Sequence, residues 1–332
     1  MLCIATKGSP RERGQQHGAK CADLIRTIQA HYSRKGLLQM DPSPILRTLA
    51  SSFPALIEEM EGIAEGADLL KEQVFRMNLQ LLDAGPSCSM AAILGTDGDP
   101  WILKTDDIGE DQLGFNVLKR DTLASGTRIL RLHFAGTIWT SAAFTDKGFC
   151  MGMTGLAGEA GPLSGLPPLA LLHVLPERCR TVTEAEAFLE SYALNHGGIS
   201  LFLADAEKNL LLAEKNVHGQ CAQRLRSSDE TLCHTNHARL GGLDNPPGYL
   251  NTPLGRNSLA RLAYLETRVP LLPRSREGLQ SIFADHTPLG GICQHGGGGL
   301  HTDYAVILSP SMHGIWLTKG PPCRAPFEFE KV

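Results

Sequence analysis

The chain has 332 residues, of which 42% are hydrophobic and 20% are charged, with a formal net charge of -4. This composition is typical of a soluble globular protein with one large or two medium domains. It argues against nucleic acid or an acidic membrane as a partner, because the net charge is close to zero. No segment approaches the roughly 20 apolar residues of a membrane span, and the apolar start of the chain is too short for a signal peptide.

The nine cysteines form no CxxC pair and show no zinc-ligand spacing. We therefore expect a reduced, cytoplasmic protein that holds no metal or other cofactor and binds no membrane.

The first 85 residues carry mainly helical patterns after a short predicted strand at 2–6. Pro10 lies near the first position of a helix, where its missing N–H costs nothing. Apolar residues continue at helical spacing to Tyr32. Further helices are predicted at 44–51, 54–64 and 71–82.

From residue 89 the pattern changes to short apolar runs separated by Gly and Asp, which predict strands. The predicted strands are 89–94, 101–105, 128–134, 138–144, 148–153, 199–204, 209–214, one ending near 233–235, and a closing hairpin of 304–308 with 314–318. The predicted helices in this part are 168–175, 183–194, 257–267 and 276–284. No charged or Pro-rich linker divides the chain, so we expect a single α+β domain, 1–332, with helices covering stacked sheets.

Cys88 lies where the two patterns meet, after the turn-forming residues Gly85, Pro86 and Ser87. The simplest interpretation is a buried structural thiol at the start of a strand. A sharper hypothesis is that Cys88 becomes a new N-terminus after self-cleavage. Its thiol and its own α-amino group would then act together.

Several separated segments resemble the motifs of one family. They are Gly8 to Gly18 (GSPRERGQQHG), Glu58 to Ala67 (EEMEGIAEGA), Asn78, Cys88-Ser89, Asp97-Gly98, Thr105-Asp106-Asp107, His234 to His237 (HTNH), Asn257 to Arg261 (NSLAR) and Ile292-Cys293. In this order and spacing, they resemble the acyl-coenzyme A:6-aminopenicillanic-acid acyltransferase family of self-processing cysteine N-terminal-nucleophile hydrolases. The resemblance implies a four-layer αββα sandwich.

The resemblance also implies cleavage of the Ser87–Cys88 bond, which would give fragments 1–87 and 88–332 that stay together as a heterodimer. The freed α-amine of Cys88, with a reference pKa of about 8, would then serve as the base for its thiol. The implied reaction is hydrolysis or transfer at a linear N-acyl (amide) bond through a thioester. The partners are a small N-acyl or amide substrate and either water, an amine or an acyl-CoA.

Two further residues receive catalytic roles from the resemblance. Asn236 would donate to the oxyanion of the tetrahedral intermediate; otherwise it is an Asx-turn residue at a strand end. Asp107 would orient the α-ammonium or assist self-cleavage; otherwise it is a solvated loop residue.

The sequence departs from the family motifs at two positions, both expected to bind substrate. Thr105 replaces the Asn of an Asn-x-Asp motif. Gln294 replaces an Arg after Ile292-Cys293 and so removes a cation expected beside the active site. Gln294 could instead lie on a loop beside the glycines at 296–299 and touch nothing.

Two other functions remain open on the sequence alone. One is an uncleaved cysteine hydrolase that pairs Cys88 with a separate histidine, His234. The other is a non-catalytic binding relative. His17, His234, His237, His286, His295 and His301 show no metal-ligand spacing, so core or surface positions are the expectation for each.

Overall fold

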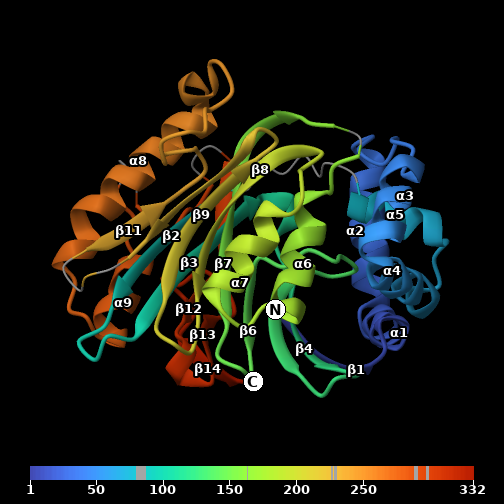
Figure 1. The fold of residues 1–332 in the computed structure, drawn as a ribbon, viewed down its shortest axis with the longest axis horizontal. Coiled ribbons are helices and arrows are strands. Elements are labelled where there is room, and N and C mark those ends of the chain that lie inside the picture. Colours follow the sequence, from blue (N-terminus) through green and yellow to red (C-terminus); the bar gives the residue numbers. More distant parts are fainter. Residues whose placement is uncertain (80–86, 163, 226, 228–229, 288–290, 297–298) are drawn as a thin grey trace.

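The computed structural model describes residues 1–79, 87–162, 164–225, 227, 230–287, 291–296 and 299–332 (Figure 1). The α-helices are α1 (Pro10–Lys20), α2 (Ala22–Arg34), α3 (Ser43–Ser52), α4 (Pro54–Ala67), α5 (Lys71–Leu79), α6 (Pro168–Arg178), α7 (Val182–Glu190), α8 (Pro253–Arg268) and α9 (Arg276–Phe283). The strands are β1 (Leu2–Gly8), β2 (Ser87–Leu94), β3 (Pro100–Gly109), β4 (Asn116–Leu123), β5 (Arg128–Phe134), β6 (Ala142–Thr145), β7 (Cys150–Ala160), β8 (His196–Ala204), β9 (Leu210–Asn216), β10 (Gly219–Arg224), β11 (Thr231–His234), β12 (Leu300–Leu308), β13 (Gly314–Thr318) and β14 (Phe327–Lys331).

The strands form two sheets. One has eight strands in the order β1-β4-β5-β6-β7-β8-β9-β10, and the other has six in the order β11-β2-β3-β12-β13-β14. The β1–β4 pair is parallel, and the other strand pairs of the two sheets are antiparallel. Strand β2, which carries Cys88, is therefore an interior strand between β11 and β3.

Three apolar clusters show how the layers pack. The largest joins α2–α7 to one face of the eight-stranded sheet. The second fills the space between the sheets, with Met90 and Ile102 from one and Leu130 and Phe202 from the other. The third joins the six-stranded sheet to α8 and α9. In Figure 1, α8 and α9 lie on one side of the two sheets and α1–α5 on the other. The α+β, four-layer αββα prediction is confirmed.

The glycines of the two N-terminal motifs allow α1 and α4 to approach closely. A Cβ atom added to Gly14 would lie 2.1 Å from the Glu59 carbonyl oxygen, and one added to Gly62 would lie 2.2 Å from the Arg11 carbonyl oxygen. Side chains at these positions are incompatible with this packing. These motifs therefore build the helical layer.

Buried ionic residues lie between this helical layer and the larger sheet. Lys119 Nζ is 2.7 Å from Glu59 and 3.1 Å from Asp121, and Arg131 is 2.8 Å from Asp121. Arg13 is 2.9 Å from Glu59. Each of these buried charges thus has an opposite charge beside it, as burial in a low-dielectric core requires.

Most predicted elements are present, and the differences have physical reasons. The predicted strand 138–144 begins only at Ala142, because 137–141 are irregular and Thr137 bonds back to Phe134. The helix predicted at 183–194 ends at Glu190, and the chain then turns to enter β8. Strands β4, β10 and β14 were not predicted. The end of the helix predicted at 71–82 lies outside the described residues beyond Leu79.

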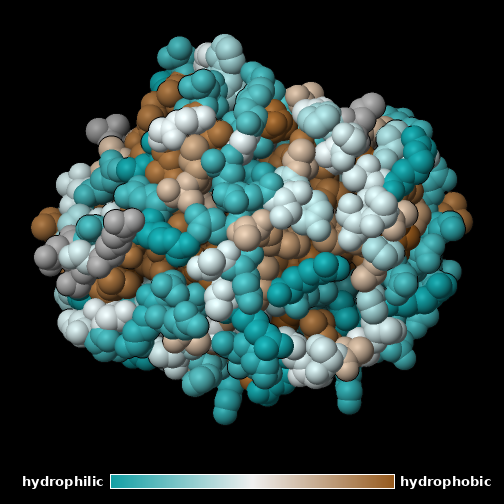
Figure 2. All heavy atoms as spheres, viewed as in Figure 1, coloured by the Kyte–Doolittle hydropathy of each residue, from teal (hydrophilic) through white to brown (hydrophobic). Residues whose placement is uncertain are grey.

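The face of the molecule shown in Figure 2 is mainly polar. Hydrophilic residues cover much of it, with apolar residues in small groups between them. Within the described ranges, no helix is both long and apolar enough to span a bilayer.

Candidate active site

Cys88 is the second residue of β2 and pairs with Asp106 on β3. Its side chain is 0% exposed. Alternate β2 residues point to opposite faces, and Met90 and Ala92 belong to the cluster between the sheets, so the Cys88 thiol lies on this inner face as well. Burial raises the pKa of this thiol to about 12, although Lys104 acts to lower it.

An ion pair lies against the sulfur. Lys104 Nζ is 3.6 Å from Cys88 Sγ and 2.9 Å from Asp106 Oδ1, and the thiol is 3.6 Å from the same carboxylate oxygen. Both charged side chains are buried. Burial acts to lower the pKa of Lys104, but Asp106 outweighs it and the pKa is raised. Lys104 is therefore a fixed cation beside the sulfur.

The backbone of Cys88 is held by two side chains from distant parts of the sequence. Its N–H donates to Asn236 Oδ1 across 3.0 Å. Its carbonyl oxygen accepts from Arg261 Nη1 across 2.5 Å. Asn236 follows the end of β11, and Arg261 lies on α8. Strand β11 and helix α8 thus meet at the start of β2.

Arg261 connects the polar groups on this side of the sheet. It donates to Asn236 Oδ1 across 2.8 Å, to Asn257 Oδ1 across 2.7 Å and to Ser89 Oγ across 2.9 Å. Burial lowers its pKa, while Asp107 acts in the opposite direction. The guanidinium and the Cys88 N–H are both donors, so they require that the oxygen of the Asn236 amide faces Cys88. The Nδ2 of Asn236 donates to the Gly155 carbonyl across 3.0 Å.

Asp107 is buried on β3, opposite Ser87 in the strand register. The alternative of a solvated loop residue is therefore wrong. Its Oδ1 accepts from Thr302 Oγ1 across 2.6 Å, whereas Oδ2 is buried without a hydrogen-bond partner among the described residues. Burial raises the pKa of this carboxyl to about 7, while Arg261 and the bond from Thr302 act to lower it.

The other sequence-predicted residues lie around this centre. The Thr105 hydroxyl accepts the Ser89 N–H across 3.2 Å, and the side chain is buried. Ser87 Oγ donates to Asn257 Oδ1 across 3.3 Å. Gln294 is half-buried; its Oε1 accepts from Asn257 Nδ2 across 3.3 Å, and its Nε2 donates to the Gly291 carbonyl. Asn257 thus connects Ser87 with Gln294.

His234 does not pair with Cys88. Its Nε2 lies 2.7 Å from Glu214 Oε1, and its Nδ1 lies 2.7 Å from the Thr235 carbonyl oxygen. Because both ring nitrogens have other partners, the arrangement disfavours a separate-histidine mechanism.

Three residues of the site had no role in the sequence analysis. Arg261 could have been found from the sequence, because it is the last residue of the NSLAR motif. Asp106 lies within the Thr105-Asp106-Asp107 motif, but the role predicted there was assigned to Asp107. Lys104 had no such signal, because a lysine in an apolar run normally lies with its ammonium in water. Their significance depends on the β2–β3 register, which places them beside Cys88.

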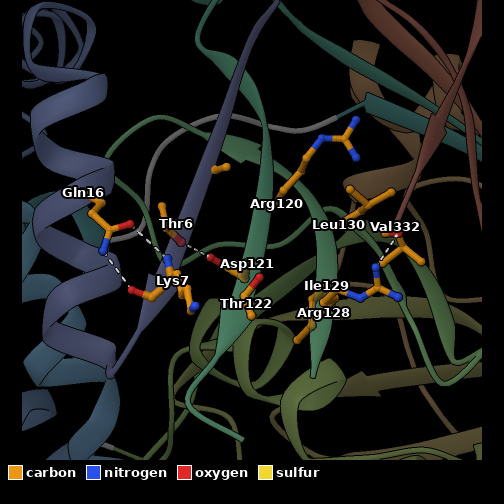
Figure 3. A pocket seen from close by; sticks show the side chains of 11 residues that line it. Thr6, Lys7, Gln16, Arg120, Asp121, Thr122, Arg128, Ile129, Leu130 and Val332 are labelled. Carbon is orange, nitrogen blue, oxygen red and sulfur yellow. Dashed lines mark hydrogen bonds between the residues drawn. The ribbon is translucent and has the colours of Figure 1, made fainter. Parts of the chain in front are cut away.

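A separate pocket of about 380 Å³ lies along β1, β4 and β5 (Figure 3). Lys7, Arg120 and Arg128 contribute to its lining, and Arg128 donates to the Val332 carbonyl oxygen across 3.3 Å. It shares no lining residue with the surroundings of Cys88 described above.

Comparison with known proteins supports the motif interpretation. Residues 130–285 match the model of the acyl-coenzyme A:6-aminopenicillanic acid acyl-transferase family. This range includes Asn236 and Arg261, and the resemblance to that family is confirmed over it. No curated protein sequence matches the chain.

Solved structures resemble the fold at low sequence identity. The N-acylethanolamine-hydrolyzing acid amidase ortholog of Caenorhabditis elegans is 14% identical, with 68% of this chain and 94% of that chain covered and a TM-score of 0.48. Penicillin V acylase from Agrobacterium tumefaciens is 12% identical, with coverages of 70% and 83% and a TM-score of 0.44. A mutant of the conjugated bile acid hydrolase from Clostridium perfringens is 10% identical, with coverages of 74% and 97% and a TM-score of 0.39.

Proposed function

We propose that this protein is a self-processing cysteine amidohydrolase or acyltransferase whose nucleophile is the N-terminal Cys88 of its mature form. One observation carries the proposal. The nitrogen of Cys88 is held by Asn236 and its carbonyl by Arg261, while its sulfur lies beside the ammonium of Lys104. A buried structural thiol needs none of these contacts. The family match over residues 130–285 includes Asn236 and Arg261, the two residues that hold the Cys88 backbone, and so supports acyl chemistry at their shared site.

Self-cleavage is the first step. The thiol attacks the Ser87 carbonyl carbon, the Ser87–Cys88 C–N bond breaks, and the thiol proton is transferred to the departing nitrogen. The product is a thioester with a free Cys88 amine. Water then hydrolyses the thioester to give the Ser87 carboxylate and the Cys88 thiol. The fragments 1–87 and 88–332 stay together as a heterodimer and as a single domain, because α2–α5 pack on strands of the later fragment.

The need for cleavage follows from burial. In the uncleaved chain Cys88 is 0% exposed and Ser87 is 2% exposed, so a substrate carbonyl has no path to the sulfur. Separation of the Ser87 carboxyl end from Cys88 frees the nitrogen and allows the sulfur to meet a substrate. The uncleaved chain is thus an inactive precursor.

In the mature form, the Cys88 amine accepts the thiol proton and the thiolate attacks the carbonyl of an N-acyl substrate. The ammonium returns the proton to the departing amine, which leaves an acyl thioester on Cys88. Water releases an acid, or an amine acceptor releases a new amide. An acyl-CoA could load the same thioester in a transfer reaction.

The surrounding groups have separate roles in this proposal. Asn236 Oδ1 holds the Cys88 amine, and its amide group is the candidate oxyanion donor. Lys104 stabilises the thiolate. Asp107 accepts from the α-ammonium and assists self-cleavage. Thr105 supports the start of β2 through the Ser89 N–H, and Gln294 faces the substrate.

Trapping of the acyl-enzyme tests the proposed function. Mature protein is mixed with a panel of N-acyl amino compounds, quenched in acid and measured by intact mass. We expect one acyl group on the 88–332 fragment, which maps to Cys88 and disappears with neutral hydroxylamine. An acyl group on any other residue, or turnover of these amides by Cys88→Ala, would contradict the proposal.

A further inference from the structure

A second cluster of reactive side chains lies beyond Gln294. His286, Cys293, His295 and Cys323 each offer one ligand atom, and these four atoms all lie within 4.8 Å of one another. His295 Nε2 is 3.3 Å from Cys293 Sγ and 3.2 Å from Cys323 Sγ. The ring centroids of His286 and His295 are 4.9 Å apart.

The four residues come from three segments of the chain. His286 follows α9, Cys293 and His295 precede β12, and Cys323 lies in the turn between β13 and β14. Backbone bonds hold the first two segments in place. The Cys293 N–H donates to the Asp285 carbonyl across 3.1 Å, and His295 forms a bridge with His301 of β12. Backbone contacts thus fix the two segments that carry His286, Cys293 and His295.

The known distances are compatible with a tetrahedral zinc site. Zn–S bonds of about 2.3 Å and Zn–N bonds of about 2.0–2.1 Å place the ligand atoms of a tetrahedron about 3.3–3.8 Å apart. The two S···N distances, 3.3 Å and 3.2 Å, lie at or just below the lower end of this range. Two thiolates would also balance the two charges of Zn²⁺, while the histidines bind as neutral rings.

We propose that His286, Cys293, His295 and Cys323 bind one Zn²⁺ in a closed structural site. Four protein ligands leave no open position for a water or a substrate, which distinguishes a structural from a catalytic zinc. Binding releases both thiol protons to the solvent. The ion joins the turn before β14 to the segment that precedes β12.

The site lies next to the candidate active centre. Cys293 and His295 flank Gln294, whose N–H donates to Thr302 Oγ1 across 2.8 Å. The same hydroxyl donates to Asp107. A zinc ion would therefore fix the position of Gln294 relative to β3.

A second group of potential ligands is less suited to a metal. Among the described residues, Glu59, His173 and Glu177 also bring ligand atoms within 4.8 Å of one another. Their carboxylates already pair with Arg13, Lys119 and Arg131. A cation there would compete with fixed positive charges.

Metal binding by the full chain tests the proposal independently of activity. Reduced, chelator-treated protein is dialysed against Zn²⁺ and its metal content is measured. Co²⁺ is then used as an optical probe. We expect one Zn²⁺ per chain and, with Co²⁺, a thiolate-to-cobalt band with tetrahedral ligand-field absorption. Absence of stoichiometric Zn²⁺, or an octahedral Co²⁺ spectrum without a thiolate band, would overturn the proposal.

Matched variants locate the site. Cys323→Ser and His286→Gln should lose the stoichiometric Zn²⁺, and Cys323→Ser should weaken the thiolate band. Cys221→Ser, at another partly exposed cysteine, and His301→Gln, at a neighbouring histidine, should retain both signals. Equal loss in the controls, or full binding by Cys323→Ser, would place the metal elsewhere.

Thermal unfolding and disulfide mapping complete the test. Zn²⁺ should raise the Tm of the chelator-treated wild type and leave that of Cys323→Ser unchanged, because only the native site gains from the ion. This comparison remains valid if Cys323→Ser is less stable. A Cys293–Cys323 disulfide in protein purified without reductant and resistant to mild reduction would contradict a zinc site.

Discussion

The backbone N–H of Cys88 donates a hydrogen bond of 3.0 Å to Oδ1 of Asn236, a residue 148 positions later in the sequence. Arg261 donates to the same oxygen. The amide oxygen therefore faces the nitrogen that self-cleavage would convert to an amine. The two ends of the Asn236 amide therefore have different roles. Its Oδ1 accepts from the Cys88 nitrogen, and its Nδ2 is the group that would donate to an oxyanion.

Substitution of Asn236 distinguishes these roles. Asn236→Asp keeps an acceptor for Arg261 and Cys88 but removes the amide donor. If the donor serves the oxyanion, kcat should fall about 10²–10³-fold. Asn236→Ala removes both functions and should also slow self-cleavage. The measurement is kcat for the hydrolysis of an N-acyl substrate, normalised to the fraction of the enzyme that has cleaved itself. Wild-type kcat in Asn236→Asp would exclude the donor role.

Lys104 should lower the pKa of the mature Cys88 thiol. Loss of Lys104 alone leaves Asp106 as an unpaired buried charge, so we compare Lys104→Met/Asp106→Asn with Asp106→Asn. The thiolate pKa should be about 1–3 units higher in the double variant, because an adjacent cation has been removed. The pH dependence of iodoacetamide alkylation at Cys88, mapped by mass spectrometry, measures this shift. The same midpoint in both proteins would mean that Lys104 does not act on the thiol.

Asp107 predicts a pH-dependent stability of the uncleaved chain. Its pKa is raised to about 7 in the folded state, against about 3.9 when unfolded. The folded state thus binds the proton more tightly. The stability that this bound proton gives to the folded state is fully present below about pH 4 and is lost as the pH rises through about 7. The total is of the order of 4 kcal/mol.

The test compares Cys88→Ala with and without Asp107→Asn. The contributions of the other titrating groups then cancel in the difference between the two unfolding free energies. The stability of the Asp107 protein, relative to its Asn partner, should fall between about pH 4 and pH 8 in urea unfolding. A constant difference over this range would show that Asp107 has an ordinary pKa.

Gln294 should set a preference for substrates without a carboxylate near the scissile bond. Gln294→Arg introduces a permanent charge and a five-donor fork. It should shift the ratio of kcat/KM for a matched acid and amide toward the acid by about 1.5–3 kcal/mol, if a charge-assisted bond forms. Gln294→Met is the neutral control and should leave the ratio close to that of the wild type. An unchanged ratio in the Arg variant would make Gln294 a bystander.

The sequence predicted the structure best where apolar and polar residues alternate or where the chain carries a family motif. The apolar period located β2, β5 and β12, and the family motifs pointed to Cys88 and Asn236, which the structure brings into contact, and to the helix that carries Arg261. These signals are local in the chain. The direction in which the Asn236 amide faces depends on Arg261 and Cys88 together, so it required the folded structure.

The remaining features were hidden because buried charges resemble exposed ones in a sequence. Lys119 and Asp121 break the apolar alternation of β4, yet both are buried in the ionic network beneath α1 and α4. Lys104 was hidden in the same way. The His286, Cys293, His295 and Cys323 cluster has no regular spacing, since Cys323 reaches it only through the turn after β13.

The most direct test of the central claim is the intact mass of the purified wild type and of Cys88→Ala. The account predicts that the wild type resolves into copurifying fragments 1–87 and 88–332 with a free α-amine on Cys88, and that Cys88→Ala stays a single chain. Cleavage of Cys88→Ala at the same bond, or a fully active wild type that remains a single chain, would contradict it.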